Sequence, residues 1–442
     1  MERSLIKGNI KKSLLMFSLP MILGDFLQQL YNITDTFIVG KYLGSQALAA
    51  VGSSFTLMTF LTSIILGLCM GSGVLFSMFY GSRQIDKLKE SFFVSFVSIG
   101  IVALVLEVIC ILGINQILKF MNIPKDIYEI TYDYLMIIFI GIFFTFIYNY
   151  FSSLLRALGD SKIPLIFLAF ASIINIVLDV YLITGVNLGV SGAALATVLA
   201  QIFSGLGIML YVILVKRELV PSKQYWCFSK EIFKKIKNYS LLTCIQQSIM
   251  NFGILMIQGL VNSFGVVTMS AFAAAVKIDS FAYMPLQDFG NAFATFIAQN
   301  KGANLNNRIN QGLKEAIKIA TIFCIIISLI VFVFADKLML IFIDSSKIEI
   351  IRQGVEYLQI EGACYLAIGC LFLLYGYYRG IGKPGISIIL TVASLGTRVA
   401  LAYALSPIFA TTIIWWAIPI GWFLADLIGI GYGIKYEKWF NE

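Results

Sequence analysis

The sequence predicts an all-α integral membrane protein with twelve transmembrane helices in two parallel six-helix lobes. The chain has 442 residues, of which 59% are hydrophobic and only 13% are charged, against roughly 45–50% and about 25% in soluble domains. A bilayer-spanning helix uses about 20 apolar residues, so this composition allows about a dozen spans. A weak internal repeat then divides the spans between two halves.

Twelve apolar runs, separated by charged residues or by Gly, Pro and Asn clusters, mark the expected helices. They lie near residues 14–39, 49–80, 92–114, 130–152, 163–184, 190–215, 239–264, 268–299, 316–335, 354–378, 384–406 and 411–434. The first run follows several basic residues, as a signal peptide would, but it carries Pro20 and Asp25 and lacks a small-residue cleavage site. We therefore expect it to be the first helix of the protein.

The basic residues predict the orientation of the chain. Most of the 32 Lys and Arg residues lie in the amino terminus, the even-numbered loops and the carboxyl terminus. Because Lys and Arg accumulate in cytoplasmic loops, both termini are predicted to be cytoplasmic. The formal net charge of +8 then reflects topology, and no nucleic-acid partner is expected. We expect a multi-pass protein of the cell membrane, in contact with lipid.

A lysine-rich polar stretch, residues 216–238, divides the chain near its middle. Matched features on its two sides lie about 220 residues apart, including Arg156 with Arg379 and Pro164 with Pro384. Six helices per half make the two halves parallel, which is a transporter architecture. The expected organisation is an amino-terminal lobe, a cytoplasmic linker and a carboxyl-terminal lobe over residues 1–215, 216–238 and 239–442.

The sequence argues against an enzyme. It contains no histidine, so the string Gly189-Val-Ser191-Gly192, which resembles that of intramembrane serine proteases, has no histidine base. It also contains no GxxxxGK(S/T) phosphate loop, so an ion gradient is the expected energy source in place of ATP. No cofactor is expected.

Five short stretches carry a family resemblance. They are residues 35–40 (DTFIVG), 49–52 (AAVG), 156–160 (RALGD), 298–303 (AQNKGA) and 379–382 (RGIG). Each is weak alone, but together with twelve helices and a central linker they resemble the multidrug and toxic compound extrusion (MATE) family over nearly the whole chain. The resemblance implies two six-helix lobes around a central cleft. It also implies an exporter that expels cationic or amphipathic drugs and toxins in exchange for inward Na⁺ or H⁺.

Acidic residues inside the spans are the candidate functional groups, because a carboxylate in hydrocarbon is costly unless it faces a cavity, a partner or an ion. Asp35 lies in the outer quarter of the first helix. At about 1.5 Å per residue, Asp179 lies about 8 Å, Asn175 about 14 Å and Thr197 about 10 Å below the same outer surface. Asn175 and Asp179 are four residues apart and project from one helix face. Such oxygen ligands suit a hard cation such as Na⁺.

The resemblance implies the same cluster, because positions matching Asp35, Asn175, Asp179 and Thr197 form the amino-lobe cation site of MATE transporters. The structural alternative is that Asp35 and Asp179 cap helix ends near the interface and that Thr197 bonds its own backbone. Two carboxylates with neutral oxygens predict Na⁺ coupling with competition by H⁺, and pure H⁺ coupling is the alternative.

The carboxyl-terminal half departs from those bacterial relatives that bind the cation with acids on helices seven and ten. Helix seven offers Gln246 and Gln247, and the inner part of helix ten has no acid. Glu361, near the outer end of helix ten, is either a substitute ligand or an interfacial residue. Asp279 is expected to form a charge-compensating network with Lys277, two residues away.

Proline and glycine predict local features of the helices. Pro20 removes the bond to the carbonyl of Met16 and permits a bend in the helix that carries Asp35, either as a static kink or as a moving hinge. Gly67 and Gly71 allow close approach of another helix.

Two other functional classes fit the sequence less well than an antiporter. A lipid-linked oligosaccharide flippase of a related superfamily would need more cations in its cleft than Lys277 and Arg398 to hold pyrophosphate. A signalling or scaffold protein gives no reason for buried acids at matched depth. We therefore expect a monomeric antiporter that alternates access between its lobes.

Overall fold

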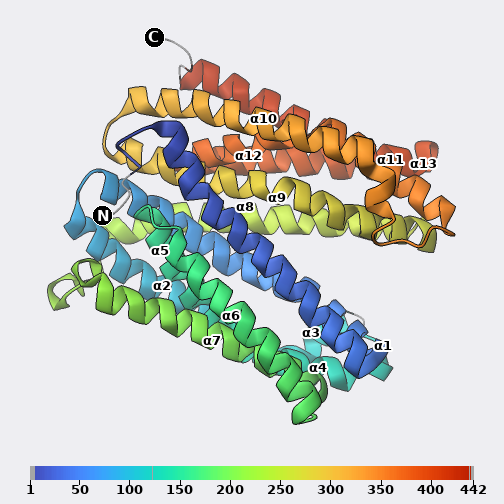
Figure 1. Ribbon diagram of the computed structural model, residues 1–442. Helices are drawn as coiled ribbons and strands as arrows, with labels where there is room; N and C mark the ends of the chain where they lie inside the picture. The colour runs from blue at the N-terminus through green and yellow to red at the C-terminus, as the bar shows by residue number, and fades with distance from the viewer. Residues whose placement is uncertain (1–4, 122, 438, 440–442) are drawn as a thin grey trace. The chain divides into compact units, whose positions relative to one another are not determined.

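The computed structural model describes residues 5–121, 123–437 and 439. Over these residues all regular structure is helical and no strand occurs (Figure 1). The α-helices are α1 (Ile10–Gly81), α2 (Ile85–Leu112), α3 (Ile114–Phe120), α4 (Lys125–Ile140), α5 (Ile142–Ala157), α6 (Lys162–Val180), α7 (Gly189–Val215), α8 (Lys230–Asn262), α9 (Val266–Gly302), α10 (Asn306–Met339), α11 (Ile348–Ala363), α12 (Tyr365–Gly380) and α13 (Pro384–Tyr436).

Helices α1 and α13 are each long enough for two spans, and each contains a non-helical residue. Gly44 in α1 has φ 85° and ψ −173°, and Ala410 in α13 has φ 53° and ψ −139°. A positive φ is readily adopted by glycine and is strained for alanine. Both breaks lie where the sequence predicts a loop. With two spans each in α1 and α13, and one in each of the bent pairs α4–α5 and α11–α12, the described residues contain the twelve predicted spans.

Several helices begin earlier than the sequence predicts, and α8 and α10 differ most from the prediction. Helix α8 begins at Lys230 and not near residue 239, and α10 begins at Asn306 and not near residue 316. The added turns are rich in Lys, Arg, Asn or Glu, which ended the apolar runs in the sequence but do not interrupt helical hydrogen bonding. The polar stretch 216–238 therefore contains two short 3₁₀-helices, η2 (Arg217–Leu219) and η3 (Lys223–Tyr225), and the start of α8.

The chain forms two compact units. The first comprises Leu19–Cys244, and the second comprises Leu5–Ser18 together with the chain from Ile245 onward. Helix α1 therefore belongs to the second unit at its start and enters the first unit between Ser18 and Leu19, directly before Pro20.

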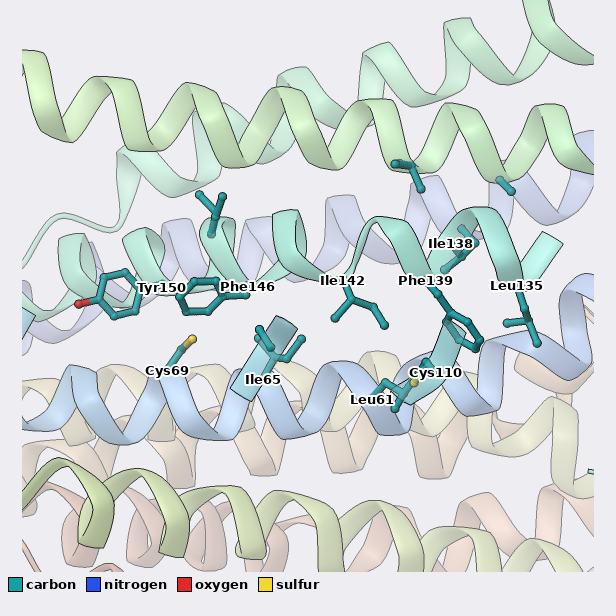
Figure 2. Packing of buried hydrophobic residues seen from close by; sticks show 14 of the residues in the cluster. Leu61, Ile65, Cys69, Cys110, Leu135, Ile138, Phe139, Ile142, Phe146 and Tyr150 are labelled. Atoms are coloured by element: carbon teal, nitrogen blue, oxygen red, sulfur yellow. The ribbon is translucent and has the colours of Figure 1, made fainter. Parts of the chain in front are cut away.

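The core of the first unit is formed by aromatic and aliphatic side chains between α1, α2, α4, α5 and α7. Figure 2 shows Ile65 and Cys69 of α1 next to Phe146 and Tyr150 of α5. The buried Tyr150 hydroxyl donates to the carbonyl of Phe92 at 2.7 Å, so its polar atom is satisfied inside an apolar environment. Because lipid is as apolar as these side chains, van der Waals packing holds this part of α1 against α5.

The predicted close approach at Gly67 and Gly71 is present. Helix α8 packs so closely on α1 that a Cβ atom at Gly71 would lie 2.4 Å from the Cα of Ser240, and one at Gly67 would lie 2.5 Å from the Cα of Cys244. Both obstacles are backbone atoms, so a side chain at either position would force the helices apart.

We expect Gly71→Ala to lower the free energy of unfolding by about 1–3 kcal/mol, the range typical of an added methyl group in a packed interior. The measurement is thermal unfolding of the purified chain in detergent. Gly52→Ala is the matched control, because it lies on the same helix and a Cβ there meets no atom within 4 Å. Equal melting temperatures for the two variants would show that the α1–α8 contact does not limit stability.

The start of the chain is held by the second unit. The guanidinium group of Arg308 donates to the carbonyls of Gly8, Lys7 and Leu5 at 2.9, 3.1 and 3.2 Å. The backbone N–H of Leu5 donates to Oε1 of the buried Gln299 at 3.1 Å. Gln299 belongs to the stretch 298–303 that the sequence singled out, so this stretch anchors the segment that leads into α1.

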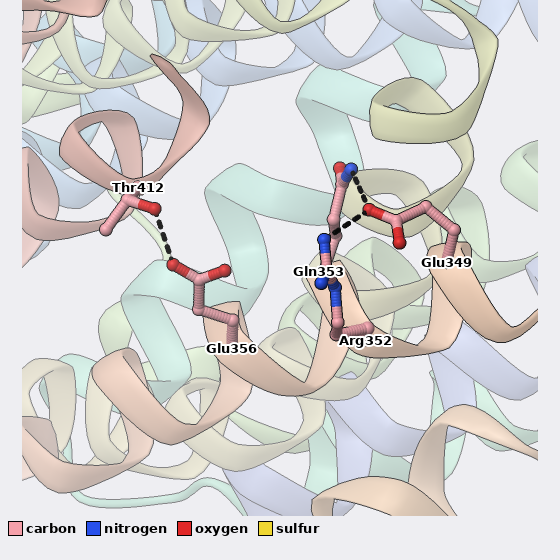
Figure 3. Close-up of polar contacts among 5 residues, drawn as sticks. All are labelled: Glu349, Arg352, Gln353, Glu356 and Thr412. Carbon is pink, nitrogen blue, oxygen red and sulfur yellow. Dashed lines mark hydrogen bonds and ion pairs between the residues drawn. The ribbon is translucent and has the colours of Figure 1, made fainter. Parts of the chain in front are cut away.

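Polar contacts also tie α11 to α13 within the second unit (Figure 3). The Thr412 hydroxyl, just after the break in α13, donates to Oε1 of Glu356 on α11 at 2.6 Å. Glu349 accepts from Arg352 at 2.8 Å and from Gln353 at 3.1 Å. The bonds to Glu349 lie within one exposed end of α11 and contribute little to stability. The Thr412–Glu356 bond, in contrast, joins α13 to α11.

Candidate functional site

Three helices of the first unit carry the four predicted site residues. Asp35 lies on α1, Asn175 and Asp179 lie on α6, and Thr197 lies on the neighbouring α7. After Asp179, α6 continues into a π-helical turn, η1 (Tyr181–Gly185). Such widened turns are often found at functional sites, and this one brings the chain round toward the start of α7.

The structure brings the four side chains together in two pairs. The carboxyl groups of Asp35 and Asp179 lie close enough to interact electrostatically. The amide Nδ2 of Asn175 donates to the Thr197 hydroxyl oxygen at 3.4 Å. Because Asn175 and Asp179 lie one turn apart on the same face of α6, the two pairs form one cluster, and both of these α6 side chains are buried.

Four oxygen atoms of this cluster are buried without a hydrogen-bond donor. They are Oδ1 of Asp35, Oδ1 of Asn175 and both carboxylate oxygens of Asp179. In the described part of the chain, no Lys or Arg forms an ion pair with either carboxylate. Buried polar atoms normally have a partner, and a set of oxygens alone fits a hard cation or a proton.

The capping role considered for the acids does not fit this geometry. Asp35 lies inside α1, well before Gly44, and Asp179 lies where α6 continues into η1. No described backbone N–H donates to either carboxylate, whereas a capping residue accepts such a bond.

Two tyrosines complete the surroundings of the cluster. Tyr31 and Tyr134 both lie within electrostatic range of the carboxyls of Asp35 and Asp179. Tyr31 could have been found in the sequence, because it precedes Asp35 by four residues and shares its helix face. Tyr134 lies on α4, and no local pattern connects it to α1 or α6.

A second buried polar cluster lies within the second unit. Asp279 on α9 accepts hydrogen bonds from the hydroxyls of Tyr365 at 2.7 Å and Tyr357 at 3.3 Å. Glu361 and Arg398 lie within electrostatic range of Asp279. Both carboxylate oxygens of Glu361 are buried without a described donor. This cluster differs from the first in containing a basic residue.

One expectation for the second half needs correction, and the structure adds a fact about Glu361. Lys277 is exposed, and among the described residues no ion pair joins it to Asp279, since residues two apart on a helix point in different directions. Glu361 is fully buried in the protein, so its side chain is exposed neither to lipid nor to water. Its position just before the bend between α11 and α12 turns it inward.

Comparison with known proteins identifies the family. The MatE family model matches residues 20–181 and 240–404, which include every residue of the first cluster except Thr197. The chain belongs to the MATE family. Among curated relatives, this MATE chain is 31% identical over 436 residues to the probable multidrug resistance protein YpnP of Bacillus subtilis, covering 97% of this chain and 93% of that protein. It is 27% identical to the probable multidrug resistance protein YoeA of the same organism, covering 96% and 94%.

The fold of this MATE chain also agrees with solved structures. An outward-facing multidrug resistance MATE family transporter of the MOP superfamily superimposes with a TM-score of 0.92 at 23% identity, covering 99% of this chain and 98% of that one. The chain is therefore a multi-pass membrane transporter of the MATE fold.

Proposed function

We propose that this chain is a multidrug efflux antiporter that exports cationic and amphipathic small molecules in exchange for Na⁺, with H⁺ as competitor, by alternating access. The observation that carries the proposal is the set of four buried, donor-free oxygens on Asp35, Asn175 and Asp179. The names of the curated relatives support the drug cargo, and the absence of a phosphate loop in the sequence supports an ion gradient in place of ATP as the energy source.

The first cluster would act as the cation site, with Asp35 and Asp179 supplying charge and Asn175 and Thr197 supplying neutral oxygens. Two carboxylates at close range repel each other, so a bound cation or proton stabilises the cluster. A ligand changes a conformational equilibrium only by its different affinity for the two states. Entry of the cation would therefore favour the state that releases the drug.

Pro20 is the proposed hinge in this cycle. Asp35 lies on the same helix, about 22 Å further along at about 1.5 Å per residue. The start of α1 is anchored to the second unit, whereas the remainder belongs to the first. A bend at Pro20, where one helical hydrogen bond is missing, would let α1 follow a change at the cation site while its start stays anchored. Both termini would be on the cytoplasmic side of the cell membrane.

The test is transport by the purified chain in liposomes. Vesicles with an imposed ion gradient and no nucleotide should accumulate ethidium or a fluoroquinolone, and dissipating the gradient should stop uptake. Strict dependence on ATP would overturn the proposal. A flippase would instead move a pyrophosphate-linked lipid and leave the cationic dye where it is, so an assay with both probes separates the two functions.

A further inference from the structure

A basic hollow lies at the lysine-rich start of α8 in the first unit. It has a volume of about 650 Å³ and is lined by residues of one helix segment, with three lysines and one acid among them: Glu231, Lys234, Lys235, Lys237, Asn238, Tyr239, Leu241 and Leu242. Nothing in the proposed transport cycle uses it, and it lies on another part of the unit from the carboxylate cluster.

The charges in this hollow are not all compensated. Lys235 is paired with Glu231 at 2.7 Å. Lys234 and Lys237 form no ion pair with any other described residue, and both are exposed. The hollow therefore presents two free ammonium groups to an outside ligand, which must be anionic.

The polarity changes along the same helix. Lys230, Lys234, Lys237 and Leu241 follow one another at helical spacing, and all four are exposed. From Lys234 to Leu241 the helix rises about 10 Å, and Leu241 is 44% exposed at the start of the apolar part of the helix. A ligand that fits this gradient has an anionic head and an apolar tail.

Two exposed aromatic residues precede the lysines of the hollow in the sequence. Trp226 is 59% and Phe228 is 53% exposed, and each is held by ring contacts within the first unit, to Phe93 and Phe233 respectively. Aromatic residues gather at the boundary between headgroups and hydrocarbon. By this rule the lysines would lie at headgroup level and Leu241 at the level of the acyl chains.

We propose that this hollow binds an anionic phospholipid, with its phosphate between Lys234 and Lys237 and an acyl chain along Leu241. Basic pockets beside transmembrane helices are a known means of holding anionic headgroups. The inference requires only that the chain is a membrane protein, so it does not depend on the cargo or on the coupling ion.

The test is lipid binding to the purified full-length chain, counted by native mass spectrometry with phosphatidylglycerol and phosphatidylcholine. Each lysine near an anionic headgroup changes affinity by about fivefold, so Lys234→Gln with Lys237→Gln should weaken phosphatidylglycerol binding about 25-fold. Phosphatidylcholine binding should not change. Lys234→Arg with Lys237→Arg keeps both charges and should bind phosphatidylglycerol as the wild type does.

The matched control is Lys11→Gln with Lys12→Gln, which removes the same charge from exposed residues of another segment. An equal loss of phosphatidylglycerol binding in this control would mean that net charge alone acts, and would overturn the proposed site.

A second experiment distinguishes a lipid from a free anion as the ligand. Leu241→Gln should weaken phosphatidylglycerol binding, and millimolar inorganic phosphate should not displace the lipid. Displacement by phosphate, with no effect of Leu241→Gln, would rule out a lipid site.

Discussion

Asp179→Asn is expected to abolish cation-coupled efflux while the chain still folds and inserts. Asparagine has nearly the shape of aspartate, so packing around the fully buried Asp179 is preserved. The substitution removes one of the two charges that face the proposed cation. A single charge–charge interaction at 4 Å is worth about 4 kcal/mol at an effective dielectric constant of 20. This corresponds to roughly a thousandfold weaker binding of the cation, so transport driven by a Na⁺ gradient should fall to the background level.

The measurement is dye transport in liposomes with equal amounts of wild type and variant, and thermal unfolding checks that the variant is folded. Asp426→Asn is the matched control, because Asp426 is a buried acid of α13 in the second unit and the chemical change is the same. Gln246→Ala and Gln247→Ala on α8 should also leave coupling largely intact. Equal loss of transport in all four variants would contradict the assignment of the cation site to the first unit.

The helices could be predicted from the sequence because bilayer thickness sets a length that few other structures require. Their ends could not, as α8 shows. Its first turns from Lys230 are helical but polar, and hydropathy separates apolar from polar segments, not helix from coil. Both breaks, at Gly44 and at Ala410, lie in predicted loops, but the sequence did not specify the residue, and alanine rarely adopts positive φ.

Only part of the first cluster has a local geometry that sequence analysis can find, and Asp35 was joined to it by its depth and by the resemblance to the MATE family. The four-residue spacing of Asn175 and Asp179 fixes a shared face, and depth along neighbouring helices brings Thr197 level with them. Tyr134 could not be found in this way, because its proximity to Asp35 depends on how α4 packs against α1.

The cluster of the second unit shows the same limit. Lys277 was the expected partner of Asp279 because it is near in sequence. The actual donors, Tyr357 and Tyr365, come from α11 and α12. Partners between helices follow from packing, and one sequence without its fold does not specify them.

Sodium is expected to be the coupling ion, and Asn175→Ala is the variant that tests it. Asn175 and Thr197 have neutral oxygens, which add little to the binding of a proton but complete the coordination of a hard cation. At fixed pH, wild-type dye efflux should rise as Na⁺ replaces K⁺. Asn175→Ala should raise the Na⁺ concentration needed for half-maximal efflux by about tenfold, the equivalent of one lost hydrogen-bond-strength contact.

Competition between protons and Na⁺ predicts how the Na⁺ concentration needed for efflux changes with pH. Protons and Na⁺ would bind the same carboxylates of Asp35 and Asp179, so lowering the pH should raise the Na⁺ concentration required, and raising the pH should lower it. Asn175→Ala should respond to an imposed pH gradient as wild type does, because both carboxylates remain. If wild-type efflux ignores Na⁺ and follows only the pH gradient, the cluster is a proton site and Asn175 has a structural role through its bond to Thr197.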